Sequence, residues 1–199
     1  MLYVITNRKI VRDNNLIKVI KSAVDAGVDA IILREKDLMY DELINLANKI
    51  KKIIYNKNIL LIINSNKRVA QEIKADGYHV GFSDFIEQKP DFDGLVGVSV
   101  HSISEAVLAE QNGADYILIS HIFETDCKKG LKPKGTIFIK EVKELVNIPV
   151  IALGGINVSN AKQVFDAGAD GIAVMSSIMT ADEPSKVVRE LKEKCTRTF

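Results

Sequence analysis

Residues 167–176 are AGADGIAVMS, and two other stretches of the chain repeat this pattern. Residues 26–35 are AGVDAIILRE, and residues 112–120 are NGADYILIS. In each stretch a glycine suited to ending a helix precedes an aspartate and then an apolar run rich in strand-forming residues. The repetition predicts one helix-to-strand turn that is used again at matching positions of a repeating fold.

Short apolar runs of this kind recur along the whole chain. Their near-continuous hydrophobicity is typical of parallel strands that are covered on both faces. The expected strands are residues 2–6, 30–35, 59–64, 77–82, 95–100, 116–120, 149–154 and 171–176. Apolar residues at helical spacing predict helices within residues 15–27, 40–55, 103–114, 160–169 and 184–194. Residues 83–94 contain Pro and Gly and predict a helix that is short or lost.

The alternation of strands and helices predicts a single (β/α)8 TIM barrel, in the α/β class, as one domain over residues 1–199. About 200 residues is the lower end of the size range for this fold. A doubly wound open sheet is the alternative. Its usual glycine-rich turn after the first strand is missing, because ITNRK follows LYV there.

Composition excludes several classes of protein. With a formal net charge of +1 the chain has no broad field that would attract nucleic acid or a membrane surface. The N-terminal apolar run is too short for a secretory signal, and no run is long enough to span a bilayer. We therefore expect a cytoplasmic protein whose two cysteines, Cys127 and Cys195, are reduced.

Glycines and serines follow the seventh and eighth expected strands, where barrels of this class commonly bind phosphate. Gly154 and Gly155 would let the backbone approach an anion closely, and residues 157–159 are expected to begin a helix. Met175 and Ser176 hold the equivalent place after the eighth strand. A tight turn and a helix cap would explain the same residues without a ligand. Their occurrence on adjacent strands favours a phosphate pocket.

Polar residues also follow the other strands, and they would face the same end of a barrel. These residues are Arg34, Glu35, Lys36, Asn64, Ser65, Asp84, Ser99, His101 and His121. His121 opens a long polar segment, residues 120–135, which is expected to be the sixth strand-to-helix loop. Loops of this length are usually functional or disordered.

Several of these motifs together resemble the thiamine phosphate synthase superfamily. They are LREK at residues 33–36, GVSVHS at 97–102, ADYILISHIFETDCKKG at 114–130, IPVIALGGI at 148–156 and AGADGIAVMSSI at 167–178. The resemblance spans nearly the whole chain. It implies one of two activities on thiazole phosphates: the synthase, which couples a pyrimidine diphosphate to the thiazole, or a thiazole tautomerase of the TenI-like branch.

The chain departs from the synthase pattern at identifiable positions. Ile32 and Phe82 stand where synthases have glutamine, Ser65 where they have aspartate, and Cys127 where they have threonine. A Mg²⁺ ion that holds a diphosphate needs carboxylate oxygens, and only Asp84 would remain.

The resemblance at residues 121–130 favours the tautomerase. His121 replaces a synthase proline, and in the tautomerase branch this histidine is the proposed acid/base residue. We therefore expect an isomerase without metal or organic cofactor, in which His121 moves a proton within a carboxylated thiazolylidene ethyl phosphate. Family resemblance also implies a homodimer. The residues expected to bind this substrate are Arg34, Lys36, Asn64, Ser99, Thr125, Lys128, Gly154, Gly155, Met175 and Ser176.

Two other functions stay open from the sequence. One is the Mg²⁺-dependent synthase with Asp84 at its metal site. The other is a non-catalytic regulator that binds thiazole or thiamine phosphates and acts through a partner. His79 is expected to be a buried barrel histidine without a catalytic role. His101 does not discriminate between the branches, and Cys127 lies beside lysines that would lower the pKa of its thiol although this chemistry needs no nucleophile.

Overall fold

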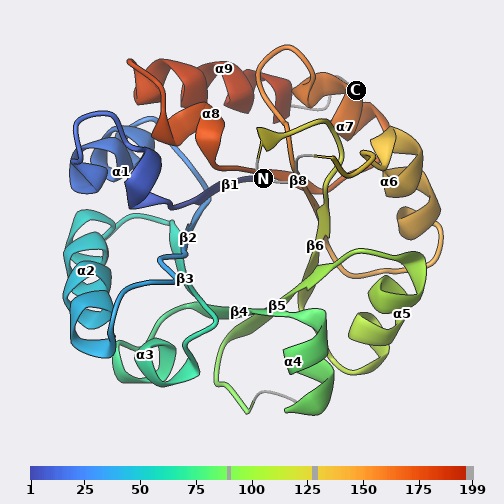
Figure 1. Ribbon diagram of the computed structural model, residues 1–199, viewed down its shortest axis with the longest axis horizontal. Helices are drawn as coiled ribbons and strands as arrows, with labels where there is room; N and C mark the ends of the chain where they lie inside the picture. The colour runs from blue at the N-terminus through green and yellow to red at the C-terminus, as the bar shows by residue number, and fades with distance from the viewer. Residues whose placement is uncertain (89–90, 127–129, 196–199) are drawn as a thin grey trace.

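The strands of the protein close into a barrel, and helices surround it (Figure 1). The computed structural model describes residues 1–88, 91–126 and 130–195. Consecutive strands pair in parallel, and β1 closes the barrel on β8. The strands are β1 (Leu2–Ile5), β2 (Ala30–Leu33), β3 (Leu60–Asn64), β4 (Gly77–Gly81), β5 (Leu95–Val100), β6 (Tyr116–Ser120), β7 (Val150–Leu153) and β8 (Gly171–Val174). The barrel predicted from the sequence is confirmed, and the open sheet is wrong.

The helices lie outside the barrel. They are α1 (Leu16–Asp25), α2 (Tyr40–Ile53), α3 (Lys67–Glu72), α4 (Phe82–Glu87), α5 (Ile103–Gln111), α6 (Gly135–Lys143), α7 (Ala161–Asp166), α8 (Ser176–Met179) and α9 (Pro184–Cys195), with a 3₁₀ turn η1 (Arg8–Ile10). The short helix expected after the fourth strand is α4. Among the described residues no helix combines the length and the apolar character that crossing a bilayer requires.

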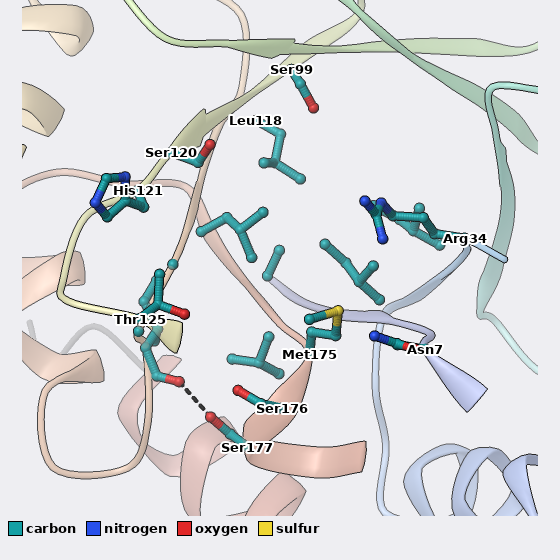
Figure 2. A pocket seen from close by; sticks show the side chains of 18 of the residues that line it. Asn7, Arg34, Ser99, Leu118, Ser120, His121, Thr125, Met175, Ser176 and Ser177 are labelled. Atoms are coloured by element: carbon teal, nitrogen blue, oxygen red, sulfur yellow. Dashed lines mark hydrogen bonds between the residues drawn. The ribbon is translucent and has the colours of Figure 1, made fainter. Parts of the chain in front are cut away.

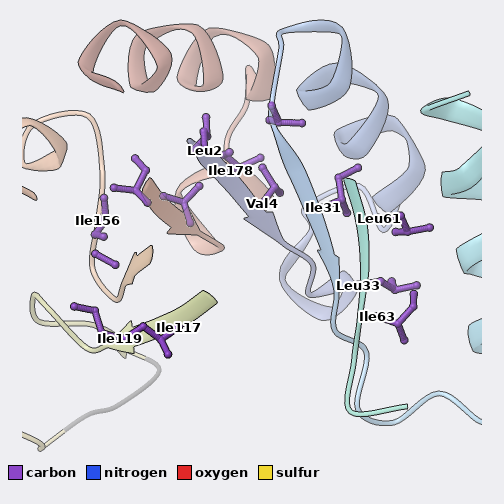
Figure 3. Packing of buried hydrophobic residues seen from close by; sticks show 14 of the residues in the cluster. Leu2, Val4, Ile31, Leu33, Leu61, Ile63, Ile117, Ile119, Ile156 and Ile178 are labelled. Atoms are coloured by element: carbon purple, nitrogen blue, oxygen red, sulfur yellow. The ribbon is translucent and has the colours of Figure 1, made fainter. Parts of the chain in front are cut away.

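Alternation of side chains along the strands divides the core into two parts. Outward residues such as Val4, Ile31 and Leu61 pack against the helices (Figure 3). Inward residues form a smaller cluster that fills the barrel. Its buried members are Tyr3, Ile5, Ala30, Ile32, Ile62, Tyr116, Leu118, Ile151 and Ala173. Ile32, one of the departures from the synthase pattern, therefore lies in the barrel interior.

The repeated aspartate has a common structural role at the amino ends of the strands. Asp29, ahead of β2, accepts a hydrogen bond from the backbone N–H of Leu2 in β1 at 2.6 Å. The carboxylates of Asp115 and Asp170 bind Val96 and Val150 in the same way, at 2.7 and 2.8 Å. Each carboxylate thereby satisfies an N–H group at the beginning of a neighbouring strand. The recurring motif thus fixes how pairs of strands begin.

Candidate active site

A cavity of about 430 Å³ opens at the carboxyl ends of the strands (Figure 2). Every strand or its following loop contributes to the cavity, as expected for this fold. The polar residues that line it are Asn7, Arg34, Asn64, His79, Ser99, Ser120, His121, Thr125, Ser176 and Ser177. Apolar residues, including Ile5, Ile32 and Leu118, form its base. The cavity therefore presents polar groups around an apolar interior, the usual character of a small-molecule site.

Two glycines form one wall of the cavity after β7. Gly154 and Gly155 have φ values of +106° and +66°, which side chains rarely tolerate. A Cβ on Gly154 would lie 2.4 Å from the Cβ of His121, and one on Gly155 would lie 2.3 Å from the carbonyl oxygen of Glu124. The turn after β7 and the loop after β6 are therefore packed backbone to backbone. Asn160 secures this turn by donating to the Gly155 carbonyl at 2.9 Å.

The helix expected to begin at residues 157–159 begins later. Asn157 accepts hydrogen bonds from the N–H and the hydroxyl of Ser159, at 2.9 and 2.6 Å, and so forms a local turn instead. Helix α7 starts at Ala161. The glycine turn and the first residues of α8 line the cavity. The first N–H groups of a helix lack intrahelical partners, so those of α8 are free of intrahelical hydrogen bonds at this wall.

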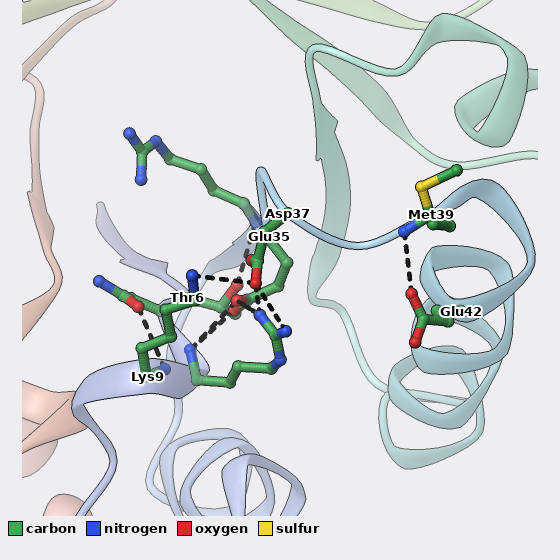
Figure 4. Close-up of polar contacts among 9 residues, drawn as sticks. Thr6, Lys9, Glu35, Asp37, Met39 and Glu42 are labelled. Carbon is green, nitrogen blue, oxygen red and sulfur yellow. Dashed lines mark hydrogen bonds and ion pairs between the residues drawn. The ribbon is translucent and has the colours of Figure 1, made fainter.

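Arg34 reaches into the cavity from the end of β2, across from Ser176 and Thr125 (Figure 2). Its backbone N–H donates to the Thr6 hydroxyl at 3.0 Å. The next residue, Glu35, points the other way, is buried, and accepts hydrogen bonds from the backbone N–H of Arg8 at 3.0 and 3.2 Å (Figure 4). Alternation along the chain thus turns Arg34 inward and gives Glu35 a structural role.

A charged cluster secures the same loop at the surface (Figure 4). The Arg8 guanidinium donates to both carboxylate oxygens of Asp37, at 2.7 and 2.9 Å. This fork and the ammonium of Lys9 hold the pKa of Asp37 well below its usual range. The cluster fixes the loop that follows Arg34.

The structure brings together most of the residues that were expected at the site from the sequence, and the exceptions are Lys36 and Asp84. Lining residues are Arg34, Asn64, Ser99, His121, Thr125, Gly154, Gly155, Met175 and Ser176. Lys36 is exposed and does not line the cavity. Asp84 lies in the first turn of α4, where it is exposed and outside the cavity lining. Lys128 and Cys127 lie outside the described residues.

His121 is buried at the edge of the cavity, and its ring is engaged with the loop it begins. The Nε2 atom lies 3.2 Å from the backbone carbonyl oxygen of Leu131, to which it can donate a hydrogen bond. Backbone bonds from Lys134 to the His121 carbonyl and from Gly135 to the Ile122 carbonyl, both 3.0 Å, bind the far end of the loop to the same place. These contacts give His121 a structural role in holding the loop.

His79 is buried in the barrel, as expected, yet it also lines the cavity. Its ring nitrogens lie 2.9 Å from the Tyr116 hydroxyl and 2.8 Å from the Ser99 hydroxyl. Burial lowers the pKa of His79 to about 4, so the imidazole is neutral near pH 7. Tyr116 was not among the residues predicted from the sequence. Its inward position within β6, two residues before Leu118, is the signal that could have found it.

His101 is exposed and contacts the end of β6. Its Nδ1 lies 3.1 Å from the Ser120 carbonyl oxygen and 3.2 Å from the Ser120 hydroxyl. His101 does not line the cavity.

The fold and the cavity define a barrel enzyme in which polar groups from many strands converge on one small-molecule site. Residues 2–178 match the family described as thiamine monophosphate synthase. The chain is 39% identical over 186 residues to a thiamine-phosphate synthase of Clostridium acetobutylicum, which covers 92% of this chain and 88% of the relative. It is 36% identical over 195 residues to one of Pyrococcus abyssi, covering 96% and 93%. The protein belongs to the thiamine monophosphate synthase family and is an enzyme of thiamine biosynthesis.

A solved structure agrees with this assignment. The thiamine phosphate pyrophosphorylase of Pyrococcus furiosus superposes with a TM-score of 0.85 at 30% identity, covering 98% of this chain and 94% of that one. A 3-hexulose-6-phosphate synthase, at 16% identity and a TM-score of 0.74, shows the shared barrel fold alone.

The expectation of a thiazole tautomerase is wrong. The curated relatives at 36 to 39% identity over most of the chain are named thiamine-phosphate synthase, which is a transferase. The expectation rested on His121, and in the structure the imidazole Nε2 of His121 contacts the Leu131 carbonyl oxygen of its own loop. The expectation of a metal-free reaction depended on the same inference and is withdrawn with it.

Proposed function

We propose that the protein is a thiamine phosphate synthase, a transferase that couples hydroxymethylpyrimidine diphosphate to a thiazole phosphate. The observation that carries the proposal is a cavity with two separate places suited to anions. One is the glycine turn after β7 with the beginning of α8, and the other is Arg34 on the opposite side (Figure 2). A reaction between a monophosphate and a diphosphate needs two such places. The names of the curated relatives support the same activity.

The thiazole phosphate is assigned to the glycine turn. Gly155 exposes its backbone to the cavity without a side chain, and the N–H groups that open α8 at Ser176 lack intrahelical partners. Thr125 lines the same region from the sixth loop. Such donors suit the three oxygens of a phosphate, while the apolar surface of Met175 beside them suits a heterocycle.

The pyrimidine diphosphate is assigned to the side of Arg34 and Asn64. A guanidinium can bind phosphate oxygens through two parallel hydrogen bonds. Exposed Lys36, two residues after Arg34, adds positive charge on the same loop, outside the cavity lining. The pyrimidine ring then lies deeper, toward Ser99 on β5, which lines the cavity.

The synthase reaction implies Mg²⁺, and the loops after β3 and β4 carry oxygen ligands of the kind that it prefers, although the Asp84 carboxylate lies outside the cavity lining. The described residues contain no cluster of three or more His, Cys, Asp and Glu side chains that could hold a metal. Mg²⁺, however, is often bound by one or two carboxylates together with substrate phosphates and waters. Asp84 after β4 would supply the carboxylate, and Ser65 and Asn64 at the end of β3 neutral oxygens. Mg²⁺ would neutralise the negative charge of the departing pyrophosphate.

The reaction balances without a proton shuttle. The bond between the pyrimidine methylene carbon and its diphosphate oxygen breaks, and the electron pair leaves with pyrophosphate. The thiazole ring nitrogen donates its lone pair to that carbon, which gives the thiazolium product. The chain contributes by holding the two substrates in line, by binding the leaving group through Arg34, and by excluding water from the apolar base of the cavity.

The test is a coupling assay with the purified protein, both substrates and Mg²⁺. We expect equimolar thiamine phosphate and pyrophosphate, with turnover abolished by EDTA and restored by added Mg²⁺. Thiamine phosphate formation that is absent in the presence of Mg²⁺ would overturn the proposal, as would turnover that EDTA leaves unchanged. Binding of both substrates without turnover would indicate a non-catalytic binding protein.

The Arg34→Lys variant tests the diphosphate position. Lysine keeps the charge but loses the fork, so the KM for the pyrimidine diphosphate should rise about tenfold, the equivalent of one charge-assisted hydrogen bond. The KM for the thiazole phosphate, which binds at the other side, should stay unchanged and serves as the internal control. Equal increases in both KM values would contradict the assignment.

A pair of His121 variants tests the structural role of this residue. His121→Gln can still donate to the Leu131 carbonyl, so coupling should stay within about twofold of the wild type, whereas His121→Ala should lower it about fivefold through the lost hydrogen bond. A general acid or base would instead cost about 10²- to 10⁴-fold in both variants. Steady-state rates with both substrates saturating separate the two roles.

The homodimer stays a prediction. Exposed apolar side chains of Leu108 on α5, Ile137 on α6 and Leu145 just after α6 support it. The cytoplasmic location also stays a prediction.

A further inference from the structure

Three polar side chains form a hydrogen-bonded row beneath the cavity. Tyr116 on β6, His79 on β4 and Ser99 on β5 all point into the barrel from neighbouring strands. The Tyr116 hydroxyl lies 2.9 Å from Nδ1 of His79, and Nε2 of His79 lies 2.8 Å from the Ser99 hydroxyl. Of these three residues, His79 and Ser99 line the cavity, while Tyr116 is buried beneath them. The row thus connects the barrel interior to the place assigned to the pyrimidine.

The packing around Tyr116 holds this row in one arrangement. Its ring occupies the space where Gly97, on the adjacent strand, would carry a side chain: a Cβ there would lie 2.0 Å from the Tyr116 Cζ atom. Tyr3 packs edge-on against another side of the Tyr116 ring. The centroids of the two rings are 5.7 Å apart, and the angle between the ring planes is 67°. A tyrosine fixed in this way has its hydroxyl held at His79.

The hydrogen-bond directions follow from counting protons. Within the described part of the chain, Nδ1 of His79 is the partner of the Tyr116 hydroxyl. Burial raises the pKa of Tyr116 well above its ordinary value, so the phenol keeps its proton. This buried O–H is satisfied only if it donates to Nδ1, and we therefore assign Nδ1 as the acceptor. A neutral imidazole then carries its single proton on Nε2 and donates it to the Ser99 oxygen. One lone pair of Ser99 is thereby occupied, and its own O–H is left to donate into the cavity.

We propose that Tyr116 and His79 are positioning residues that make Ser99 a hydrogen-bond donor to a ring nitrogen of the pyrimidine substrate, an inference that rests on the proposed synthase function. A serine free to rotate would donate and accept equally well. With Tyr116 and His79 in place, Ser99 favours a ring that presents an unprotonated nitrogen at this point. The row therefore contributes to substrate specificity without touching the reacting atoms.

The first experiment observes the row itself, without substrate. ¹⁵N NMR near pH 7, on protein whose histidine rings are labelled with ¹⁵N, should show His79 protonated on Nε2 alone. In Tyr116→Phe the phenol donor is lost while the ring still fills the space at Gly97, so the His79 signals should shift toward a mixture of the two tautomers. A wild-type His79 protonated on Nδ1 would overturn the proposal, whether or not the chain proves to be a synthase.

The second experiment measures coupling with the pyrimidine diphosphate and with an analogue in which CH replaces the ring nitrogen. In Tyr116→Phe the KM for the pyrimidine diphosphate should rise about five- to tenfold, the equivalent of one neutral hydrogen bond, while kcat changes less than twofold. The wild type should prefer the pyrimidine diphosphate over the analogue, and in Tyr116→Phe this preference should shrink by the same factor. In Ser99→Ala the preference for the pyrimidine diphosphate over the analogue should disappear. The double variant that also carries Tyr116→Phe should have the same KM for the pyrimidine diphosphate as Ser99→Ala alone.

Tyr3→Phe is the matched control. It removes the hydroxyl of the tyrosine that packs against Tyr116, but this hydroxyl makes no contact with His79. Its kinetics and its His79 signals should equal those of the wild type. If Tyr3→Phe and Tyr116→Phe raise the KM equally, or if Tyr116→Phe and Ser99→Ala act additively, Tyr116 has only a packing role and the proposal fails.

Discussion

Replacing Gly155 with alanine should lower kcat/KM for coupling by about 10²- to 10³-fold, the cost of displacing a phosphate site and its backbone donors. The new Cβ would lie 2.3 Å from the Glu124 carbonyl oxygen and 2.9 Å from the Phe123 backbone, at a φ of +66°. Neither neighbour is the flexible end of a side chain, so the loop after β6 must move away from the turn after β7. Thr125, the next residue of that loop, would move with it.

Gly113→Ala is the matched control for this substitution. Gly113 also has a positive φ, +87°, but nothing lies within 4 Å of the position its Cβ would take. Alanine there costs about 1–2 kcal/mol of backbone strain and should leave the turnover of folded protein unchanged. Circular dichroism and the thermal unfolding midpoint show how much of each variant is folded. If Gly155→Ala is as active per folded molecule as Gly113→Ala, the phosphate is not bound at the glycine turn.

The barrel could be predicted from the sequence because its signals are local. Buried parallel strands need near-continuous apolar runs, and the aspartate after each recurring glycine turn binds the beginning of a neighbouring strand. A fourth copy of this contact, from Asp76 to the backbone N–H of Leu61 at 2.8 Å, escaped the sequence analysis. The residues ahead of Asp76 are KA, without the glycine that marks the other copies.

The composition of the candidate site was less predictable, because it depends on which way each side chain points and on contacts between distant segments. The positions of Arg34, Asn64 and Ser99 at the ends of strands correctly predicted that they line the cavity, because their neighbours along each strand face outward. Lys36, two residues beyond Arg34, follows the buried Glu35 in a loop secured by Arg8, and there the alternation no longer holds. His121 is engaged by the carbonyl of Leu131, ten residues away, which no spacing rule indicates.

The free energy of unfolding of the protein should fall by about 3 kcal/mol between pH 6.5 and 4 because of the protonation of His79 alone. In the unfolded chain its pKa is near 6.5, whereas burial lowers the pKa of His79 to about 4 in the folded protein. The groups that face its ring nitrogens are the phenol of Tyr116 and the hydroxyl of Ser99, neither of which ionises in this range. Between the two pKa values the unfolded chain binds the extra proton, so the contribution is complete above pH 6.5 and is lost as the pH falls toward 4.

Urea unfolding at pH 7, 6, 5 and 4.5, followed by circular dichroism, measures this loss. Other groups titrate in the same range, so the quantity to compare is the difference between the wild type and His79→Gln, which carries no ionisable group at this position. At pH 7 the free energy of unfolding of His79→Gln should be lower than that of the wild type, because the substitution disturbs the hydrogen bonds to Tyr116 and Ser99. This gap in the free energy of unfolding should narrow steadily as the pH falls. His101→Gln removes an exposed imidazole and controls for the loss of a histidine as such. A gap between the wild type and His79→Gln that is constant from pH 7 to 4.5 would mean that His79 accepts its proton equally well in the folded and unfolded chain. The imidazole would then be accessible to water, and the buried row from Tyr116 to Ser99 could not hold it neutral.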